Sequence, residues 1–396
     1  MTERIYLSPP HLNGSEAKAL ENTLSTNWVA PVGPQLDKWE EEITNRVEAA
    51  ACCLTNSGTA AIHLALRALG VGRGSVVFVQ SHTHIGSVNP ILYLGAIPVF
   101  IDSEPGSWNM SPAFLEEAIQ ALEQGGLRDK LAAKYRVPEE QVQARCILPI
   151  HLYGMPAPMD RIMEISGKYN IPVLEDSAEA LGSSYNGKPC GGIAQAGVFS
   201  FNGNKIITTG GGGAVVARSA DLIKKVKYWA TQATEPAPHY QHHEMGYNYR
   251  MSNVLAGLGR EQFRFLGERI AQRQANFTRY MQYFQKTEEY GYQVSFQEEA
   301  TGSSSNRWLT AVLIDPAKNK GIGPSEIRAA LENANIESRL LWKPMHLQPL
   351  FAEASFFGDG TSERLFNTGL CLPSGSGLTS SDFTRIFKVL DAVFCS

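Results

Sequence analysis

The pattern of apolar and polar residues predicts a layered α/β fold between residues 54 and 216. Short apolar runs recur there, and amphipathic stretches of helical period separate them. Because such alternation is typical of strands buried on both faces, we predict a mostly parallel sheet covered by helices. The charged stretch 124–145 interrupts the alternation and is expected to be a solvated helical excursion. The predicted strands are 76–79, 98–102, 146–150, 172–176, 197–201 and 213–217, and the predicted helices are 59–69, 111–123, 159–168 and 220–230.

The chain beyond residue 251 follows a different pattern, which predicts a small α+β domain. A long helical pattern runs to residue 284, and the polar segment 297–306 that follows is predicted to be a mobile loop. We therefore expect a large domain at 1–250, whose N-terminal segment lines the functional site, and a small domain at 251–396. Within the small domain we predict strands at 308–315 and 337–341 and helices at 325–335 and 381–394.

Composition and charge narrow the class of protein. The chain has 396 residues, 43% of them hydrophobic, and a formal net charge of -4, so it carries no broad basic field for nucleic acid or an anionic membrane. No N-terminal stretch combines basic residues with an apolar core, so neither export nor membrane spanning is expected. We expect a cytoplasmic enzyme with a small-molecule partner. Its cysteines form no C-x-x-C pair and are expected to be free thiols: Cys52, Cys53, Cys146, Cys190, Cys371 and Cys395.

A lysine and an aspartate are the main candidates for chemistry. Lys205 follows Ser200 and Asn202 and precedes four consecutive glycines, and Asp176 ends the predicted buried strand 172–176. A partly buried lysine can form a Schiff base with an aldehyde. An ionised carboxylate beneath a pyridine nitrogen keeps that nitrogen protonated, so that the ring can accept the electrons of a carbanion. An ordinary surface lysine and a buried aspartate are the alternative, but the combination favours a pyridoxal phosphate site.

The segment from Asn56 to Thr59 indicates a place for the phosphate. It is a turn that enters a predicted helix whose first residues are small, including Gly58. The free amide groups and positive dipole of such a helix start suit an anion. An ordinary capped helix start is the alternative, and the conjunction with Ser200 and Lys205 favours the phosphate.

Several histidines are weaker candidates. His84 follows a predicted strand and can place a flat ring over the cofactor, although a solvated loop histidine is the alternative. His151 and Tyr153 follow another predicted strand, where they can approach the site or serve local hydrogen bonds. No metal site is expected, because the remaining histidine cluster lacks a carboxylate or thiol at a fixed spacing: His239, His242 and His243.

Four motifs together resemble the DegT/DnrJ/EryC1/StrS family of sugar-nucleotide aminotransferases: 56–60, 174–178, 200–205 and 246–250. The resemblance spans nearly the whole chain. It implies an α/β, fold type I, pyridoxal phosphate-dependent (aspartate aminotransferase-like) enzyme with a large mixed-sheet cofactor domain and a small α+β C-terminal domain. Further motifs are similar to the subgroup that aminates C4 in UDP-bacillosamine synthesis: 7–11, 27–31, 305–308, 338–346 and 371–375.

The resemblance also implies residue roles. Lys205 would be the Schiff-base lysine and proton shuttle, Asp176 the pyridinium partner, and Glu179 a contact near the ring hydroxyl. The remaining cofactor contacts would be Gly58, Thr59, Ser200, Asn202, His84 and, from the other subunit of a homodimer with shared active sites, Asn248. His84 departs from the aromatic residue usual in the family at the stacking position. Candidates for substrate binding are Trp28 and three arginines suited to a diphosphate or carboxylate: Arg250, Arg307 and Arg339.

The activity that the resemblance implies is a ping-pong transamination. The amino group of L-glutamate would pass to C4 of a UDP-linked 4-keto-6-deoxy-N-acetylhexosamine, giving a UDP-4-amino sugar for bacterial glycan synthesis. A 3-aminotransferase, or an enzyme for a GDP- or dTDP-linked keto sugar, is the alternative. A 3-dehydratase on the same scaffold would be a further alternative, but such an enzyme has histidine at this position. Lys205 therefore argues against it. A pyridoxal phosphate-binding regulatory protein would need a DNA-contacting or partner module, and no basic helix-turn-helix pattern is found.

Overall fold

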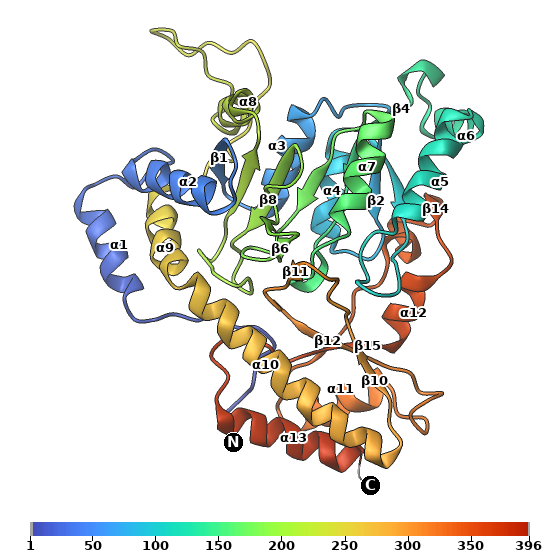
Figure 1. Cartoon of the computed structure of the whole chain (residues 1–396). Helices are drawn as coiled ribbons and strands as arrows, with labels where there is room; N and C mark the ends of the chain where they lie inside the picture. Colours follow the sequence, from blue (N-terminus) through green and yellow to red (C-terminus); the bar gives the residue numbers. More distant parts are fainter. Residues whose placement is uncertain (1–2, 395–396) are drawn as a thin grey trace.

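The computed structural model describes residues 3–394, and its upper part in Figure 1 is a mixed sheet with helices on both faces. Two four-stranded units form this sheet. Parallel bridges from Ile147 to Val173 and from Ile150 to Asp176 join the units edge to edge. In spatial order the strands are β1 (Ala51–Thr55), β9 (Gly213–Ala217), β8 (Ala196–Ser200) and β5 (Leu174–Asp176), then β4 (Gln143–Leu148), β2 (Ser75–Gln80), β3 (Ile97–Ile101) and β14 (Ser355–Phe357).

Strand direction confirms the predicted mixed α/β class. Strand β9 runs antiparallel to both β1 and β8, whereas all other neighbours within the two units are parallel. The sequence pattern located six of the eight strands but missed β1 and β14. Most of β1 precedes residue 54, where the predicted alternation begins, and β14 has three residues, too few to show a period.

Helices cover both faces because the strands alternate their side chains. In β2, Val77 and Val79 pack into one core layer and Val76 and Phe78 into the layer on the opposite face. The first layer lies against α3 (Gly58–Ala68), α4 (Ile85–Tyr93) and α8 (Ala220–Ala230), and the second against α5 (Pro112–Glu123), α6 (Gly126–Tyr135) and α7 (Met159–Tyr169). Helices α1 (Glu16–Ser25) and α2 (Pro34–Arg46) lie at the β1 end of the sheet, beside α9 (Asn253–Arg264).

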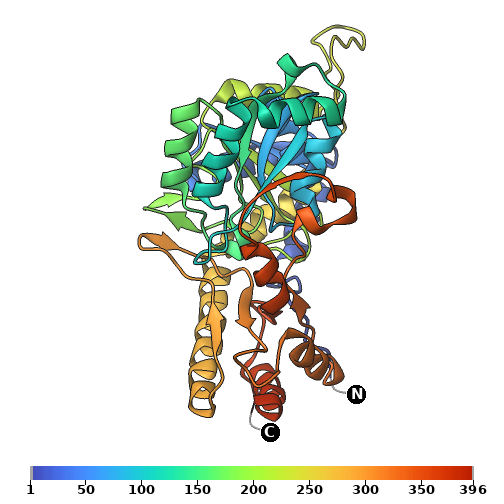
Figure 2. The ribbon, with the colours of Figure 1, turned by 90° about the vertical axis from the view of Figure 1, so that its right-hand side faces the viewer.

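The lower part of the molecule is a smaller α+β unit, as predicted, and Figure 2 shows its helices below the large sheet. Its four strands are all antiparallel to their neighbours. The long predicted helix is interrupted at Phe265, so that α9 is followed by a separate α10 (Leu266–Thr287). The unit comprises β10 (Val294–Phe296), β12 (Thr310–Ile314), β15 (Gly369–Leu372) and β13 (Arg339–Leu340) in spatial order, with α11 (Pro324–Asn333) and α13 (Ser380–Phe394). Over the two units together, short 3₁₀ turns lie at 139–141, 152–154, 288–290, 345–347 and 349–351.

The prediction of a mobile loop at 297–306 is wrong. Strand β11 (Ser303–Ser304) pairs with β6 (Ser184–Tyr185), which also pairs with β7 (Lys188–Pro189). Asn306 is fully buried, and its amide donates hydrogen bonds to the carbonyl oxygens of Glu179 at 2.9 Å and Leu181 at 3.0 Å. The buried polar residues at the two ends of this segment, Gln297, Ser305 and Asn306, are therefore partners for backbone groups, whereas residues 298–302 are exposed.

The predicted division at residue 250 stays a prediction, and two segments cross it. Ile5 forms a parallel bridge with Ile336 and packs in the core of the small unit. After β13 the chain returns to the large sheet, where β14 pairs with β3 and α12 (Thr361–Thr368) begins beside the end of β3. The buried Asp102 carboxylate accepts hydrogen bonds there from the backbone N–H groups of Gly360 at 2.9 Å, Thr361 at 3.0 Å and Ser362 at 2.9 Å.

Two further observations concern the class of protein. Among residues 3–394, no helix combines the length and the apolarity that a bilayer-spanning segment needs. The five cysteines within this part of the chain are free and buried, as expected, whereas Cys395 lies outside the described residues.

We predict that Asp102→Asn lowers the thermal unfolding midpoint by several degrees. The amide offers one acceptor oxygen where the carboxylate offers two, and it directs N–H donors at buried backbone N–H groups, at a cost of about 2 to 3 kcal/mol. Differential scanning calorimetry measures the midpoint. The control is Asp221→Asn, whose side chain is 84% exposed and which should shift the midpoint little. Equal midpoints for the two variants would contradict the prediction.

Candidate active site

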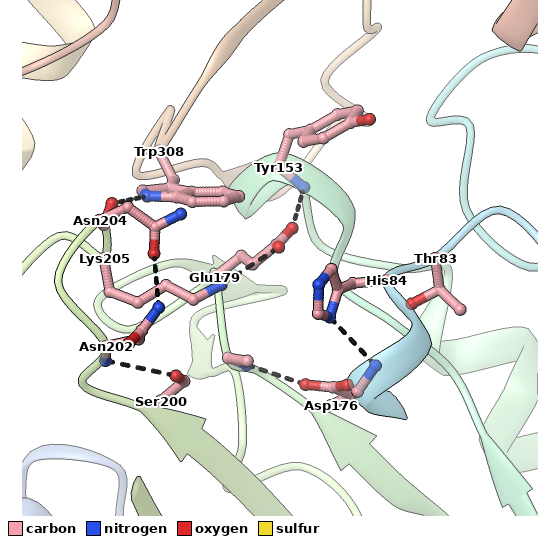
Figure 3. A network of polar contacts seen from close by, with 12 residues as sticks. Thr83, His84, Tyr153, Asp176, Glu179, Ser200, Asn202, Asn204, Lys205 and Trp308 are labelled. Carbon is pink, nitrogen blue, oxygen red and sulfur yellow. Dashed lines mark hydrogen bonds and ion pairs between the residues drawn. The ribbon is translucent and has the colours of Figure 1, made fainter. Parts of the chain in front are cut away.

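A cavity of about 420 Å³ opens where β5 and β8 end. Asp176 is the last residue of β5, Ser200 is the last residue of β8, and the loop that carries Lys205 follows directly. Ligands of such sheets bind at the carboxyl ends of the strands. The structure therefore brings together three candidates that the sequence separates by up to 29 positions, and Figure 3 shows them around one space.

Asp176 carries a carboxyl group that is buried beside the cavity. Its side chain is 3% exposed, Ser87 Oγ donates to its Oδ2 at 2.7 Å, and the Ala178 N–H donates to its Oδ1 at 3.1 Å. Within residues 3–394 it forms no ion pair with a lysine, arginine or histidine. Because a buried charge needs a partner, this carboxylate fits the protonated ring nitrogen of a pyridine cofactor.

Lys205 lies between a carboxylate and an aromatic ring. Its Nζ is 3.3 Å from Glu179 Oε1 and 4.2 Å from the centroid of the Trp308 ring. The lysine side chain is only 13% exposed, yet it lines the cavity. A lysine amine that reaches into a protected cavity fits the requirement for condensation with an aldehyde.

Glu179 is an acid with an altered proton affinity. Burial raises the pKa of Glu179 to about 7, against the attraction of the Lys205 ammonium and a hydrogen bond from the Tyr153 N–H to Oε2 at 2.8 Å. Tyr153 adopts a left-handed backbone conformation, with φ 56° and ψ 19°, that bulky residues seldom adopt. The turn at Tyr153 thus directs its N–H group to the carboxylate that pairs with the lysine.

The start of α3 forms a cradle beside Ser200. Ser57 caps the helix, with its Oγ accepting the Ala60 N–H at 3.0 Å, and Gly58 and Thr59 line the cavity. A Cβ atom on Gly58 would lie 3.0 Å from the Ser200 Cβ, so the absence of a side chain keeps this space open. Helix-start amides next to a serine hydroxyl fit a phosphate group.

His84 lies on the opposite side of the cavity from Lys205 in Figure 3. Its Nδ1 accepts the Gly86 N–H at 3.0 Å and so caps α4. Desolvation, followed by the positive charge of Lys205, lowers the pKa of His84, although Asp176 acts in the opposite direction. A neutral imidazole can stack on a flat aromatic ring, and this fits the predicted role.

Two of the arginine candidates do not line this cavity. Arg250 forms a buried ion pair with Glu40 and donates to the Leu54 carbonyl at 3.1 Å, so it ties β1 to α2. Arg307 pairs with Glu299 at 2.6 Å. Both have structural ion pairs, because each is largely buried and a buried guanidinium needs an acid.

Arg339 is the arginine candidate that does line the cavity. Its side chain is 71% exposed and is bonded to Glu337 at 2.7 Å, which places a guanidinium at the mouth. Asn202 also lines the cavity, and its side chain donates to Asn204 Oδ1 at 3.4 Å. Trp28 and Asn248 do not line the cavity of their own chain: Trp28 is 48% exposed, and Asn248 forms a bridge with Thr231.

The cavity contains aromatic residues that no single sequence pattern identified as site residues. Trp308 is 2% exposed, and its Nε1 donates to the Asn204 carbonyl at 2.8 Å. Trp342 lines the same cavity and has its ring 5.0 Å from that of Tyr153 and 5.7 Å from that of His84. Both tryptophans belong to motifs of the resemblance, but their distance along the chain from Lys205 concealed their position beside it.

Comparisons with known proteins agree with this geometry. A model of the DegT/DnrJ/EryC1/StrS aminotransferase family matches residues 10–391. EpsN of Bacillus subtilis (strain 168), named as a putative pyridoxal phosphate-dependent aminotransferase, is 44% identical over 100% of this chain and 97% of its own length. The GDP-perosamine synthase of Caulobacter vibrioides is 32% identical over 98% of each protein. Among solved structures, DesV of S. venezuelae is 26% identical with a TM-score of 0.82, covering 97% of this chain and 95% of its own.

We predict that Glu179→Gln changes the pH dependence of stability of the cofactor-free protein. Because burial raises the pKa of Glu179 from 4.5 to about 7, its contribution to stability is fully present below about pH 4.5 and is lost as the pH rises through about 7. The variant should lack this loss, which is on the order of 2 to 3 kcal/mol.

Thermal unfolding midpoints of both proteins between pH 5 and pH 8 measure the effect. Glu164→Gln, with a side chain that is 74% exposed, is the matched control and should follow the wild type. Parallel midpoint curves for the wild type and Glu179→Gln would show that Glu179 keeps an ordinary proton affinity.

Proposed function

Because this chain belongs to the DegT/DnrJ/EryC1/StrS family of pyridoxal phosphate-dependent sugar aminotransferases, we propose that it acts on C4 of a UDP-linked sugar. The amino donor is L-glutamate. The acceptor is a UDP-linked 4-keto-6-deoxy-N-acetylhexosamine, and the product is a UDP-4-amino sugar for bacterial glycan synthesis. The observation that carries this proposal is the placement of Lys205 and the buried Asp176 anion on one cavity.

When bound, pyridoxal phosphate supplies an electron-accepting ring for carbanion chemistry. Asp176 holds a negative charge where a ring nitrogen would lie, and Ser87 fixes its orientation through the hydrogen bond to Oδ2. Gly58, Thr59 and Ser200 line the same cavity and would hold the phosphate. Lys205 is the group that accepts and returns a proton at the reacting carbon, since its Nζ reaches into the same cavity.

The position of Arg339 supports the proposal that the substrates are anionic. It places a guanidinium at the cavity mouth, where a fork of N–H groups suits a diphosphate or a carboxylate. The nucleoside diphosphate lies far from the reacting carbon, and its binding energy can position C4 beside Lys205. One cationic site at the mouth would then serve glutamate and the nucleotide sugar in turn.

We further propose a homodimer in which the partner completes each active site. Apolar residues lie exposed on the N-terminal segment, with Leu24 at 54%, Trp28 at 48%, Val29 at 47% and Val32 at 58%. Asn248, which does not line its own cavity, would contact the cofactor of the other subunit. A cytoplasmic location fits this proposal, since the described cysteines are free thiols.

A GDP-linked keto sugar is the second candidate acceptor. The support is the 32% identity to the GDP-perosamine synthase of Caulobacter vibrioides over nearly the whole chain. Few contacts distinguish nucleobases, so the choice between UDP and GDP depends on residues remote from Lys205.

Lys205→Ala should abolish turnover while the variant still binds pyridoxal phosphate non-covalently, because the phosphate cradle and Asp176 remain. Borohydride treatment followed by peptide mass spectrometry should detect a reduced adduct on Lys205 in the wild type and none in the variant. Lys343→Ala, which removes an exposed lysine, is the control and should retain the adduct and the activity. Steady-state turnover by Lys205→Ala would refute the assignment of this lysine.

A panel of 4-keto sugars linked to UDP, GDP and dTDP tests the acceptor. With L-glutamate as donor, we expect amination at C4 of the UDP-linked N-acetylhexosamine, with kcat/KM at least about tenfold above the other two. Product mass and NMR identify the aminated carbon. Preference for the GDP-linked sugar would favour the second candidate, and amination at C3 would overturn the proposed position.

A further inference from the structure

We propose that Glu179 and the indole ring of Trp308 form a resting site for the Lys205 ammonium group whenever this lysine is not joined to the cofactor. Trp308 is then a positioning residue for proton transfer by Lys205. This inference rests on the role of Lys205 in the proposed function and adds a residue to which no role in the reaction has been assigned.

The two contacts lie at the same ammonium group. Lys205 Nζ is 3.3 Å from Glu179 Oε1 and 4.2 Å from the Trp308 ring centroid. Figure 3 shows the lysine side chain extending beneath the indole ring toward the carboxylate. An ammonium over the face of tryptophan within about 6 Å is attracted by the ring quadrupole, more strongly where water is excluded. The geometry therefore restrains the amine from two directions.

The indole ring is itself held rigidly. Its Nε1 donates to the Asn204 carbonyl at 2.8 Å, so the ring is hydrogen-bonded to the residue that directly precedes Lys205. Arg273, a fully buried guanidinium on α10, donates to the Trp308 carbonyl and to Ser8 Oγ at 3.0 Å. Ser8 Oγ in turn donates to the same Asn204 carbonyl at 2.8 Å. Trp308 is thus fixed relative to Lys205 by three segments of the chain.

The Glu179 carboxylate is also held in place by the backbone around it. The Tyr153 N–H donates to Glu179 Oε2, and the left-handed backbone at Tyr153 aims that N–H group. Gly154 follows with φ 95°, and a Cβ atom there would lie 2.0 Å from Asn306 Oδ1. Uncommon backbone conformations of this kind persist only where the surroundings enforce them, and they concentrate at functional sites.

Glu179 and the Trp308 ring attract Lys205 in complementary ways, because only Glu179 titrates near neutral pH. Burial raises the pKa of Glu179 to about 7, so the charge that attracts Lys205 varies with pH, whereas the attraction of the ring does not. The other titratable groups that line this cavity are Asp176, His84, Arg339 and Cys371. Substitution of Trp308 leaves all of them in place, so a change in Lys205 behaviour can be assigned to the loss of Trp308, with its ring contact and its hydrogen bond to Asn204.

Covalent attachment of pyridoxal phosphate to the cofactor-free protein, followed by visible absorbance across pH, tests the inference. Attachment needs a neutral amine, and loss of the ring removes a stabilising contact of the ammonium. For Trp308→Leu we expect the pH midpoint of the attachment rate to fall by about 0.5 to 1 unit, a three- to tenfold faster attachment below the midpoint. Trp308→Phe should lie between this variant and the wild type.

The loaded enzyme provides a second readout. In single-turnover reactions with L-glutamate, we expect Trp308→Leu to slow the rate by about tenfold while the half-saturating glutamate concentration stays within about twofold. Trp342→Leu and Trp342→Phe are the matched controls, because Trp342 lines the same cavity and packs on His84 and Tyr153. They should keep the wild-type pH midpoint.

A wild-type midpoint in folded Trp308→Leu would overturn the resting site, as would an equal shift in Trp342→Leu. If Trp308→Leu fails to fold by circular dichroism, Trp308→Phe decides by the same criterion. Failure of the proposed function has a different signature: the borohydride adduct would then lie on another lysine, or Lys205→Ala would turn over, whatever the Trp308 variants do.

Discussion

A carboxylate buried at the end of a central strand is the constraint on which this molecule depends. Asp176 is 3% exposed and receives hydrogen bonds from Ser87 and Ala178, but it has no cationic partner in the described part of the chain. An isolated buried anion is costly unless a cation or proton joins it. Strand β5 therefore carries a charge that a protonated cofactor ring would compensate, and the rest of the cavity is arranged around that position.

The loop that carries Lys205 is held by hydrogen bonds from distant segments of the chain. The Asn204 carbonyl, one residue before Lys205, accepts hydrogen bonds from Ser8 near the N-terminus and from Trp308 in the small unit. Arg273 on α10 holds both donors. Because one carbonyl and one guanidinium connect these segments, the position of the Lys205 amine depends on the packing of the two units against each other.

Local sequence determined most of the large unit. Apolar runs located six of its eight strands because each is buried on both faces, and β9 was predicted with the bounds that the structure has. The candidate phosphate cradle, Asp176 and Lys205 were also proposed from sequence, since a helix start, a strand end and a glycine-rich loop each have a local signature. These features depend on short-range periodicity and backbone preferences, which a sequence displays directly.

Tertiary structure alone decided which side chains meet. Nothing local distinguishes Arg250, buried against Glu40, from Arg339 at the cavity mouth, because each arginine has both polar and apolar neighbours in the sequence. The contact of Trp308 with Lys205 spans 103 positions. The segment 297–306 was interpreted as a mobile loop because the partners of its buried polar groups, such as the Glu179 carbonyl bonded to Asn306, lie far away in the sequence. The sequence thus determined the elements and identified Lys205 and Asp176 as the candidate pair, whereas ion-pair partners, burial and ring contacts arise only when packing brings remote residues together.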